Sequence, residues 1–169
     1  MEGKIPDFAS EAVYIIHAIK GYETHEARIK ALFPRFKLSY NFITLGDPSL
    51  FSDDVLAKYF DPKIRNVLSD GVLSCTLNHI LAYEEMVKNG HEMALIFEND
   101  PFFLSNFEDN LQKVLKEAIT LAPGFIISLE NSTLRFPSYW QTQKEKYLYP
   151  AKDGRMAGAY LIDLKAAQN

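Results

Sequence analysis

The sequence predicts an α/β fold in which a mostly parallel central sheet is flanked by helices. Short apolar runs alternate with longer segments of helical periodicity, and this alternation is typical of parallel strands that are covered by helices on both faces. The chain has 169 residues. That is the usual size of one domain, so we expect a single domain over residues 1–169. A hydrophobic share of 47% is enough for a buried core.

The first third of the chain reads as strand, helix and strand. The apolar, β-branched run at residues 12–16 predicts a buried strand. Residues 23–33 mix charged and apolar side chains and are followed by Pro34, which predicts a helix that ends there. Residues 40–45 predict a second strand, because turn-forming residues follow it at 46–48.

The middle of the chain carries the clearest helix. Ser52 and the aspartates after it predict a short capped helix to about residue 60. A serine and an aspartate at 69 and 70 then start a longer helix with apolar residues at helical spacing, and Asn89-Gly90 ends it. The fully apolar run at 93–97 is too short for a confident helix, so we interpret it as a central strand.

The last third predicts helix, strand, loop, strand and helix. Asn106 can cap a helix through residue 121, and residues 124–129 form the next apolar run. Residues 131–150 are rich in tyrosine, glutamine and lysine and read as a loop. A glycine-led strand at 158–162 precedes a helix that begins near Asp163. The sequence stops a few residues into that helix, so we expect a domain shortened at its C-terminus.

Composition and charge exclude several classes of protein. The net charge of −4 argues against a general nucleic-acid binder, which usually shows a basic patch. The single cysteine, Cys75, excludes a disulfide framework and any site with several cysteines. No apolar run approaches the roughly 18 residues of a membrane span, and the N-terminus is too polar for a signal peptide. We therefore expect a soluble, cytoplasmic chain with at most peripheral membrane contact.

The first candidate site is Glu98-Asn99-Asp100, directly after the central strand. Ligands of such sheets bind at the carboxyl ends of the strands. Side chains at alternate positions of an extended segment point the same way, so Glu98 and Asp100 can converge. Paired carboxylates suit a hard divalent cation that neutralises a diphosphate. The alternative is a solvated turn that only breaks the strand.

Other polar residues follow the first strand or lie on the long helix. His17 and Lys20 could meet a nucleotide, although plain loop polarity explains them equally well. Neither a glycine-rich dinucleotide motif nor a phosphate loop is present. Cys75 and His79 are four residues apart on the long helix and can touch. We interpret both as core residues, because cysteine–histidine catalysis also needs an orienting group.

The loop at 131–150 and the residues after it combine aromatic with basic side chains. Tyr139, Trp140 and Tyr147 could stack on sugar rings. The basic residues of this region are Lys144, Lys146, Lys152 and Arg155. Such a combination suits sugar or phosphate recognition, and a solvated flap is the alternative.

Three blocks of the sequence resemble glycosyltransferase family 25, bacterial enzymes of lipopolysaccharide or lipooligosaccharide assembly. They are the opening strand and loop at 13–21, the segment LSCTLNHILAYEEMVKNGHEMALIFENDPFF at 73–103, and MAGAYLID at 156–163. In the family, a cysteine-containing helix with a Ser-His pair precedes an apolar strand and an acidic triplet, usually Glu-Asp-Asp. The resemblance extends from about residue 12 to the end of the chain.

The resemblance implies a Rossmann-like fold of the GT-A type and transfer of a sugar, often galactose, from a UDP donor to a growing saccharide or lipid-linked saccharide. It also implies Mn²⁺ or Mg²⁺ held by Asp100, with Glu98 as second ligand or ribose contact. The donor-binding residues expected from position are His17, Lys20, Asp47, His79, Glu98 and Asp100. The acceptor-binding residues expected are Tyr139, Trp140 and Tyr147.

This sequence departs from the family pattern at two points. Asn99 replaces the middle acid of the triplet, and His17-Ala18 stands where the family has Asn-Leu. The general base for the acceptor hydroxyl is not identified, and Glu130 and Asp163 are the candidates. The main hypothesis is thus a metal-dependent glycosyltransferase at the inner face of the inner membrane. The alternative is a degenerate module that binds a nucleotide sugar without turnover.

Overall fold

The computed structural model describes residues 8, 12–130, 137–151 and 157–169. The strands are β1 (Val13–Ile16), β2 (Asn41–Ile43), β3 (Met93–Glu98), β4 (Ile126–Ser128) and β5 (Ala159–Asp163). The α-helices are α1 (Glu23–Leu32), α2 (Asp53–Tyr59), α3 (Asp70–Asn89), α4 (Phe107–Ala118) and α5 (Leu164–Ala167). Short 3₁₀ turns are η1 (Phe33–Phe36), η2 (Pro48–Leu50), η3 (Ile64–Asn66) and η4 (Tyr139–Gln141). Each strand and helix expected from the sequence is present.

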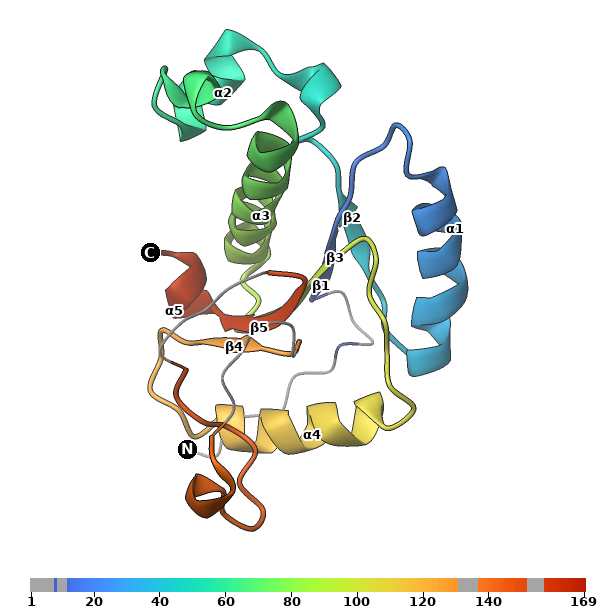
Figure 1. Cartoon of the computed structure of the whole chain (residues 1–169), viewed down its shortest axis with the longest axis vertical. Helices are drawn as coiled ribbons and strands as arrows, with labels where there is room; N and C mark the ends of the chain where they lie inside the picture. Colours follow the sequence, from blue (N-terminus) through green and yellow to red (C-terminus); the bar gives the residue numbers. More distant parts are fainter. Residues whose placement is uncertain (1–7, 9–11, 131–136, 152–156) are drawn as a thin grey trace.

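The five strands form one mixed sheet in the order β2-β1-β3-β5-β4 (Figure 1). β1 pairs in parallel with both β2 and β3, whereas β5 pairs antiparallel with both β3 and β4. The expected mostly parallel arrangement therefore holds for β2, β1 and β3. It does not hold for β5 and β4, whose pairings are antiparallel. The chain leaves β4 and enters β5 at the same edge of the sheet, whereas a parallel pair needs a crossover.

The core has two layers, one on each face of the sheet. Alternate residues of β1 point to opposite faces, as the period of a strand requires. Val13 and Ile15 pack in the layer that α1 and α4 cover, and Tyr14 and Ile16 pack in the layer under α3 and α5 (Figure 1). The strands β1, β3 and β5 are thus buried on both sides, which explains their continuously apolar sequences.

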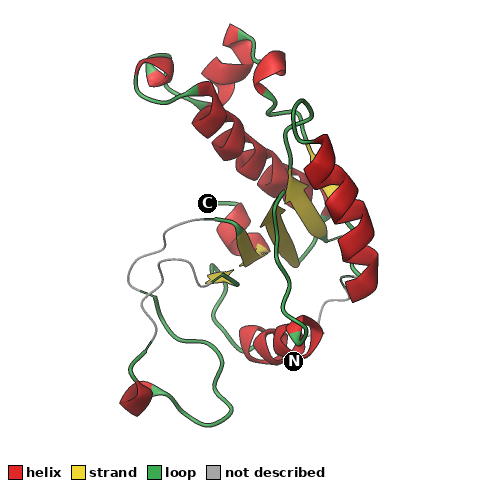
Figure 2. Cartoon of the chain, turned by 45° about the vertical axis from the view of Figure 1, so that its right-hand side comes forward, coloured by secondary structure: helices red, strands yellow, loops and turns green. Residues whose placement is uncertain are grey.

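Helix α3 is fixed at both ends by local sequence. Ser69 caps the first turn by accepting a hydrogen bond from the backbone N–H of Val72, and Gly90 ends the helix in the left-handed conformation with φ of 68°. With 20 residues, α3 is the longest helix among the described residues. Figure 2 shows it running from the sheet towards the end of the molecule where α2 lies. The first half of α3 therefore stands beside the carboxyl ends of β1 and β2. Among the residues that the structure describes, no helix combines the length and apolar character needed to cross a membrane.

Candidate functional site

A cavity of about 410 Å³ lies at the carboxyl ends of the parallel strands. We call it the β1–α3 cavity. It is lined by Ile16, His17, Ala18, Lys20, Tyr22, Asp47, Pro48, Ser49, Gly71, Ser74, Cys75, Asn78, Glu98 and Asn99. These residues come from the loops after β1 and β2, the first half of α3 and the end of β3. Of the expected donor contacts, His17, Lys20, Asp47 and Glu98 meet here.

Asn78 joins the walls of the cavity. Its Oδ1 accepts a hydrogen bond of 2.8 Å from the backbone N–H of Gly46, and its Nδ2 donates over 3.5 Å to the carbonyl oxygen of His17. Gly46 has no room for a side chain, since a Cβ there would lie 2.6 Å from Asn78 Oδ1. One buried amide thus holds the loops after β1 and β2 against α3.

Asp47 makes a second connection between the same two loops. Its Oδ2 accepts from the backbone N–H of Ile19 at 3.1 Å, and its Oδ1 accepts from both the N–H and the hydroxyl of Ser49. Hydrogen bonds from Ser49 hold the pKa of Asp47 below its ordinary value because they favour the charged carboxylate. This buried carboxylate therefore fixes the loop that carries Lys20.

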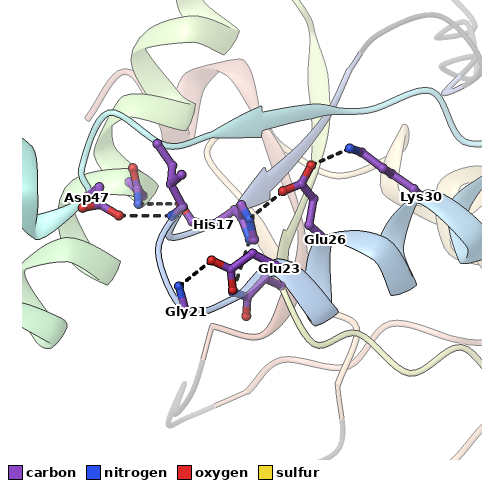
Figure 3. A network of polar contacts seen from close by, with 9 residues as sticks. His17, Gly21, Glu23, Glu26, Lys30 and Asp47 are labelled. Carbon is purple, nitrogen blue, oxygen red and sulfur yellow. Dashed lines mark hydrogen bonds and ion pairs between the residues drawn. The ribbon is translucent and has the colours of Figure 1, made fainter.

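His17 lies buried at the back of the cavity, with an exposed fraction of 3%. Its Nε2 is 3.8 Å from Glu26 Oε2, and Glu26 in turn pairs with Lys30 (Figure 3). On the other side, Asn99 Nδ2 donates to His17 Nδ1 at 3.4 Å. Burial lowers the pKa of His17, although the Glu26 carboxylate acts in the opposite direction.

His79 lies just beneath the cavity, close to the acidic end of β3. It is buried, its Nδ1 is hydrogen-bonded to the Tyr160 hydroxyl at 2.7 Å, and its Nε2 is 3.9 Å from Glu98 Oε1. The His79 ring is the main reason that the pKa of Glu98 lies below its ordinary value. Cys75 Sγ is 3.8 Å from the same Glu98 oxygen. Burial, with Glu98 adding to it, raises the pKa of the Cys75 thiol to about 11.

Asp100 does not join Glu98. β3 ends at Glu98 and the chain bends at the next two residues, so the alternation of an extended strand no longer applies to them. Asp100 is exposed and lines a second hollow of about 720 Å³, the β3–α4 hollow. Glu130 and Tyr147 line the same hollow, among aromatic residues of β3, α4 and the loop between them. The predicted pair of carboxylates is therefore divided between two neighbouring hollows.

The remaining candidates lie away from the β1–α3 cavity. Asp163 stands opposite Met93, at the end of the sheet away from the cavity, because β5 runs antiparallel to β3. There its carboxylate accepts from the backbone N–H groups of Gly124, Phe125 and Ala166. Tyr139 and Trp140 are 81% and 90% exposed on η4, in a segment that Figure 2 shows at the end of the molecule opposite α2. Lys152 and Arg155 lie outside the described residues.

Sequence reasoning assigned no role to Asn78 or Ser49 and interpreted Cys75 as a core residue, whereas the structure places all three in the cavity wall. Asn78 carried a usable signal, since a polar amide on the apolar face of a helix has to find buried partners. Ser49 and Cys75 carried no comparable signal, because their position depends on how the loops and β3 meet α3.

Fold and site together define a class of protein. A polar cavity at the carboxyl ends of parallel strands in an α/β sheet is where such folds bind nucleotides and similar ligands. The sequence model of glycosyltransferase family 25, described as a family of lipopolysaccharide biosynthesis proteins, matches residues 12–169. The chain belongs to glycosyltransferase family 25, and its family assigns it to the glycosyltransferases.

Similar curated proteins are animal members of the same family. The chain is 36% identical over 64 residues to the inactive glycosyltransferase 25 family member 3 of Homo sapiens, covering 38% of this chain and 11% of that protein. The probable inactive member 3 of Bos taurus gives the same identity and coverage. That of Rattus norvegicus is 33% identical over 67 residues, which is 40% of this chain and 12% of the relative. The aligned stretch therefore spans about a tenth of each relative.

Proposed function

We propose that this chain binds a UDP-sugar in the β1–α3 cavity and transfers the sugar, of galactose type, to a lipopolysaccharide or lipooligosaccharide acceptor. The observation that carries the proposal is a polar cavity at the carboxyl edge of the parallel strands, in a chain that matches family 25 from residue 12 onwards. Both proposed substrates belong to the cytoplasmic side of the inner membrane, where we place the reaction.

Within the cavity, the described lining residues have distinct roles. Lys20 is the exposed cation of the lining and faces the space where a diphosphate would sit. Sugar transfer places negative charge on the leaving UDP, and a fixed cation stabilises that charge. Asn78 and Asp47 hold the Lys20 loop and the β2 loop in place, which keeps the site preorganised.

The acceptor half of the site is best placed in the β3–α4 hollow. Tyr147 and the 83%-exposed Phe102 offer aromatic faces, and Asp100 and Glu130 offer carboxylates. Of the two residues considered as general base, Glu130 lies at this hollow and accepts a backbone hydrogen bond, from the N–H of Gly158. Asp163 lies at the opposite end of the strands and accepts three. Glu130 is therefore the better candidate to take the proton of the acceptor hydroxyl.

The requirement for Mn²⁺ or Mg²⁺ stays a prediction. Hard divalent ions need several oxygen ligands, and Glu98 and Asp100 line different hollows. That pair does not fit a shared ion in this arrangement, so no step of the transfer is assigned to it.

Donor binding is the first test. Isothermal titration of the chain with UDP-galactose should show saturable binding, and Lys20→Ala should weaken it about tenfold, equivalent to about 1.4 kcal/mol. Lys116→Ala is the matched control, because it removes the same charge from the exposed face of α4. Equal affinities for the two variants would contradict the placement of the diphosphate. Manganese and a chelator, added in parallel, test the metal requirement.

A second candidate function is binding of a nucleotide sugar without turnover. Asn99 stands in the cavity wall where the family usually has an acid, and the similar animal proteins are named inactive. Chromatography of UDP released from UDP-galactose, with and without a lipooligosaccharide acceptor, separates the two functions. Donor binding without acceptor-stimulated release of UDP would support the binding module.

A further inference from the structure

Three side chains with different ligand atoms meet at the inner wall of the β1–α3 cavity. Cys75 and His79 are four residues apart on α3, which places them on one face of the helix. Glu98 reaches the same point from the end of β3. Cys75 Sγ, His79 Nε2 and a Glu98 carboxylate oxygen all lie within 4.8 Å of one another. A rigid helix and a central strand therefore hold a thiol, an imidazole and a carboxylate together.

The His79 ring is oriented towards this point. Its Nδ1 is hydrogen-bonded to the Tyr160 hydroxyl, which is itself 2.7 Å from the Tyr83 hydroxyl. Its Nε2 is buried and has no hydrogen-bond partner among the described residues, and only 8% of the residue is exposed. A buried ring nitrogen without a partner is unfavourable. A fixed Nδ1 contact that leaves Nε2 directed at other ligand atoms is the usual arrangement around a histidine that binds a metal.

The mixture of ligand atoms decides which ion fits. Hard ions such as Mg²⁺ prefer oxygen ligands throughout, whereas Zn²⁺ accepts sulfur, nitrogen and oxygen together. The ligand atoms of a tetrahedral zinc ion lie about 3.3–3.6 Å apart. Glu98 Oε1 is 3.8 Å from Cys75 Sγ and 3.9 Å from His79 Nε2. Small side-chain rotations would therefore bring these atoms to bonding distance.

The fourth position of such an ion would be open. Cys75 and Glu98 line the β1–α3 cavity, so an ion between them and His79 would face its interior. Three protein ligands and one open position are typical of zinc sites that bind water or a substrate group. With the thiol proton lost, the thiolate and the carboxylate together balance the two charges of the ion.

We propose that Cys75, His79 and Glu98 form a binding site for a zinc-type divalent ion, with the fourth position directed into the β1–α3 cavity. Tyr160 is a positioning residue that fixes the His79 ring. Binding of the ion can be tested apart from the proposed transfer reaction, because it requires neither a nucleotide nor an acceptor.

Cobalt is the direct probe, since Co²⁺ replaces Zn²⁺ in such sites and absorbs strongly in the near ultraviolet when a thiolate binds it. The chain has one cysteine, so such a band can arise only from Cys75. Titration of the metal-free chain with Co²⁺, in the absence of nucleotide, should give this band at one equivalent, and one equivalent of Zn²⁺ should abolish it. A folded chain that binds Co²⁺ without a thiolate band would overturn the proposal, whatever the variants do.

Four variants sharpen the test, with folding checked by circular dichroism. Cys75→Ala should lose the band, and Tyr160→Phe should weaken Zn²⁺ binding about tenfold, the lower end of the effect of removing a hydrogen bond to a metal-bound histidine.

Two variants should leave Zn²⁺ binding unchanged. His91→Gln removes a histidine beyond the far end of α3, and Asp100→Asn removes the carboxylate of the other hollow. Loss of Zn²⁺ binding in Asp100→Asn, with Cys75→Ala unaffected, would assign the ion to the acidic triplet and overturn the proposal. UDP-galactose titration of the same proteins reports separately on the transfer hypothesis.

Discussion

The two hollows that flank the end of β3 are held together by different forces. The β1–α3 cavity is walled by polar side chains whose hydrogen bonds cross from one element to another, as Asn78 and Asp47 do. The β3–α4 hollow is walled by aromatic rings, with Phe103 stacked on Phe107 at 4.4 Å and in edge contact with Phe97. Directional bonds fix positions, whereas apolar contacts mainly add stability. Fixed side-chain positions and fold stability are therefore supplied by different sides of one strand.

The largest expected effect tests the aromatic side. Phe103→Ala should lower the free energy of unfolding by about 3 kcal/mol, the lower end for a buried phenylalanine, since this ring is partly exposed. UDP-galactose affinity should stay within about twofold, because Phe103 does not line the β1–α3 cavity. Urea denaturation and calorimetric titration measure the two quantities. Phe102→Ala is the control, since its ring is 83% exposed and should cost less than about 0.5 kcal/mol.

An intermediate effect tests the polar side. Gly46→Ala places a Cβ 2.6 Å from Asn78 Oδ1, so the amide must move and the buried N–H of residue 46 loses its acceptor. We expect a loss of about 1–3 kcal/mol in unfolding free energy, together with weaker donor binding. Gly71→Ala is the matched comparison, since its nearest neighbouring atom is 4.0 Å away. In that helical position alanine should stabilise the chain by roughly 0.5–1 kcal/mol. Similar results for the two variants would show that the contact between Gly46 and Asn78 does not hold the polar wall together.

The smallest effect is a pH dependence at His17. Burial lowers the pKa of His17 from its ordinary value of 6.5, so below pH 6.5 the unfolded chain binds a proton more readily than the folded one. Stability is therefore fully present above pH 6.5 and is lost as the pH falls from 6.5 to the folded-state pKa. His17→Asn should flatten this slope in unfolding curves recorded between pH 7.5 and 5 at roughly 0.5-unit steps. An unchanged slope would show that His17 is not perturbed by its surroundings.

The sequence predicted the elements well because their signals are local. The apolar run at 93–97 and the caps of α3 indicate a strand and a helix from a few neighbouring residues. The direction of β5 was not predictable in the same way, because it depends on which edge the chain returns to after β4. Because β5 is antiparallel, Asp163 lies beside the start of β3 and not beside its end.

Part of the candidate site was predictable from the sequence, and part was not. His17, Asp47, His79 and Glu98 follow strand ends or sit on the inward face of α3, positions that the α/β pattern brings together. The separation of Asp100 from Glu98 was not visible, because it follows from a bend that starts where β3 stops pairing.

The connection between β4 and β5 has a consequence for how such a chain can diverge. Ser128 is paired with Tyr160, and Gly158 bonds both Glu98 through its carbonyl and Glu130 through its N–H. The connection is therefore anchored at both ends in the sheet, and lengthening it costs only about 0.6 kcal/mol for each doubling. We expect insertions, deletions and substitutions between residues 131 and 157 to be tolerated without disturbing the β1–α3 cavity. Under the proposed function, such a segment can acquire a new acceptor preference by mutation while the donor-binding cavity is inherited unchanged.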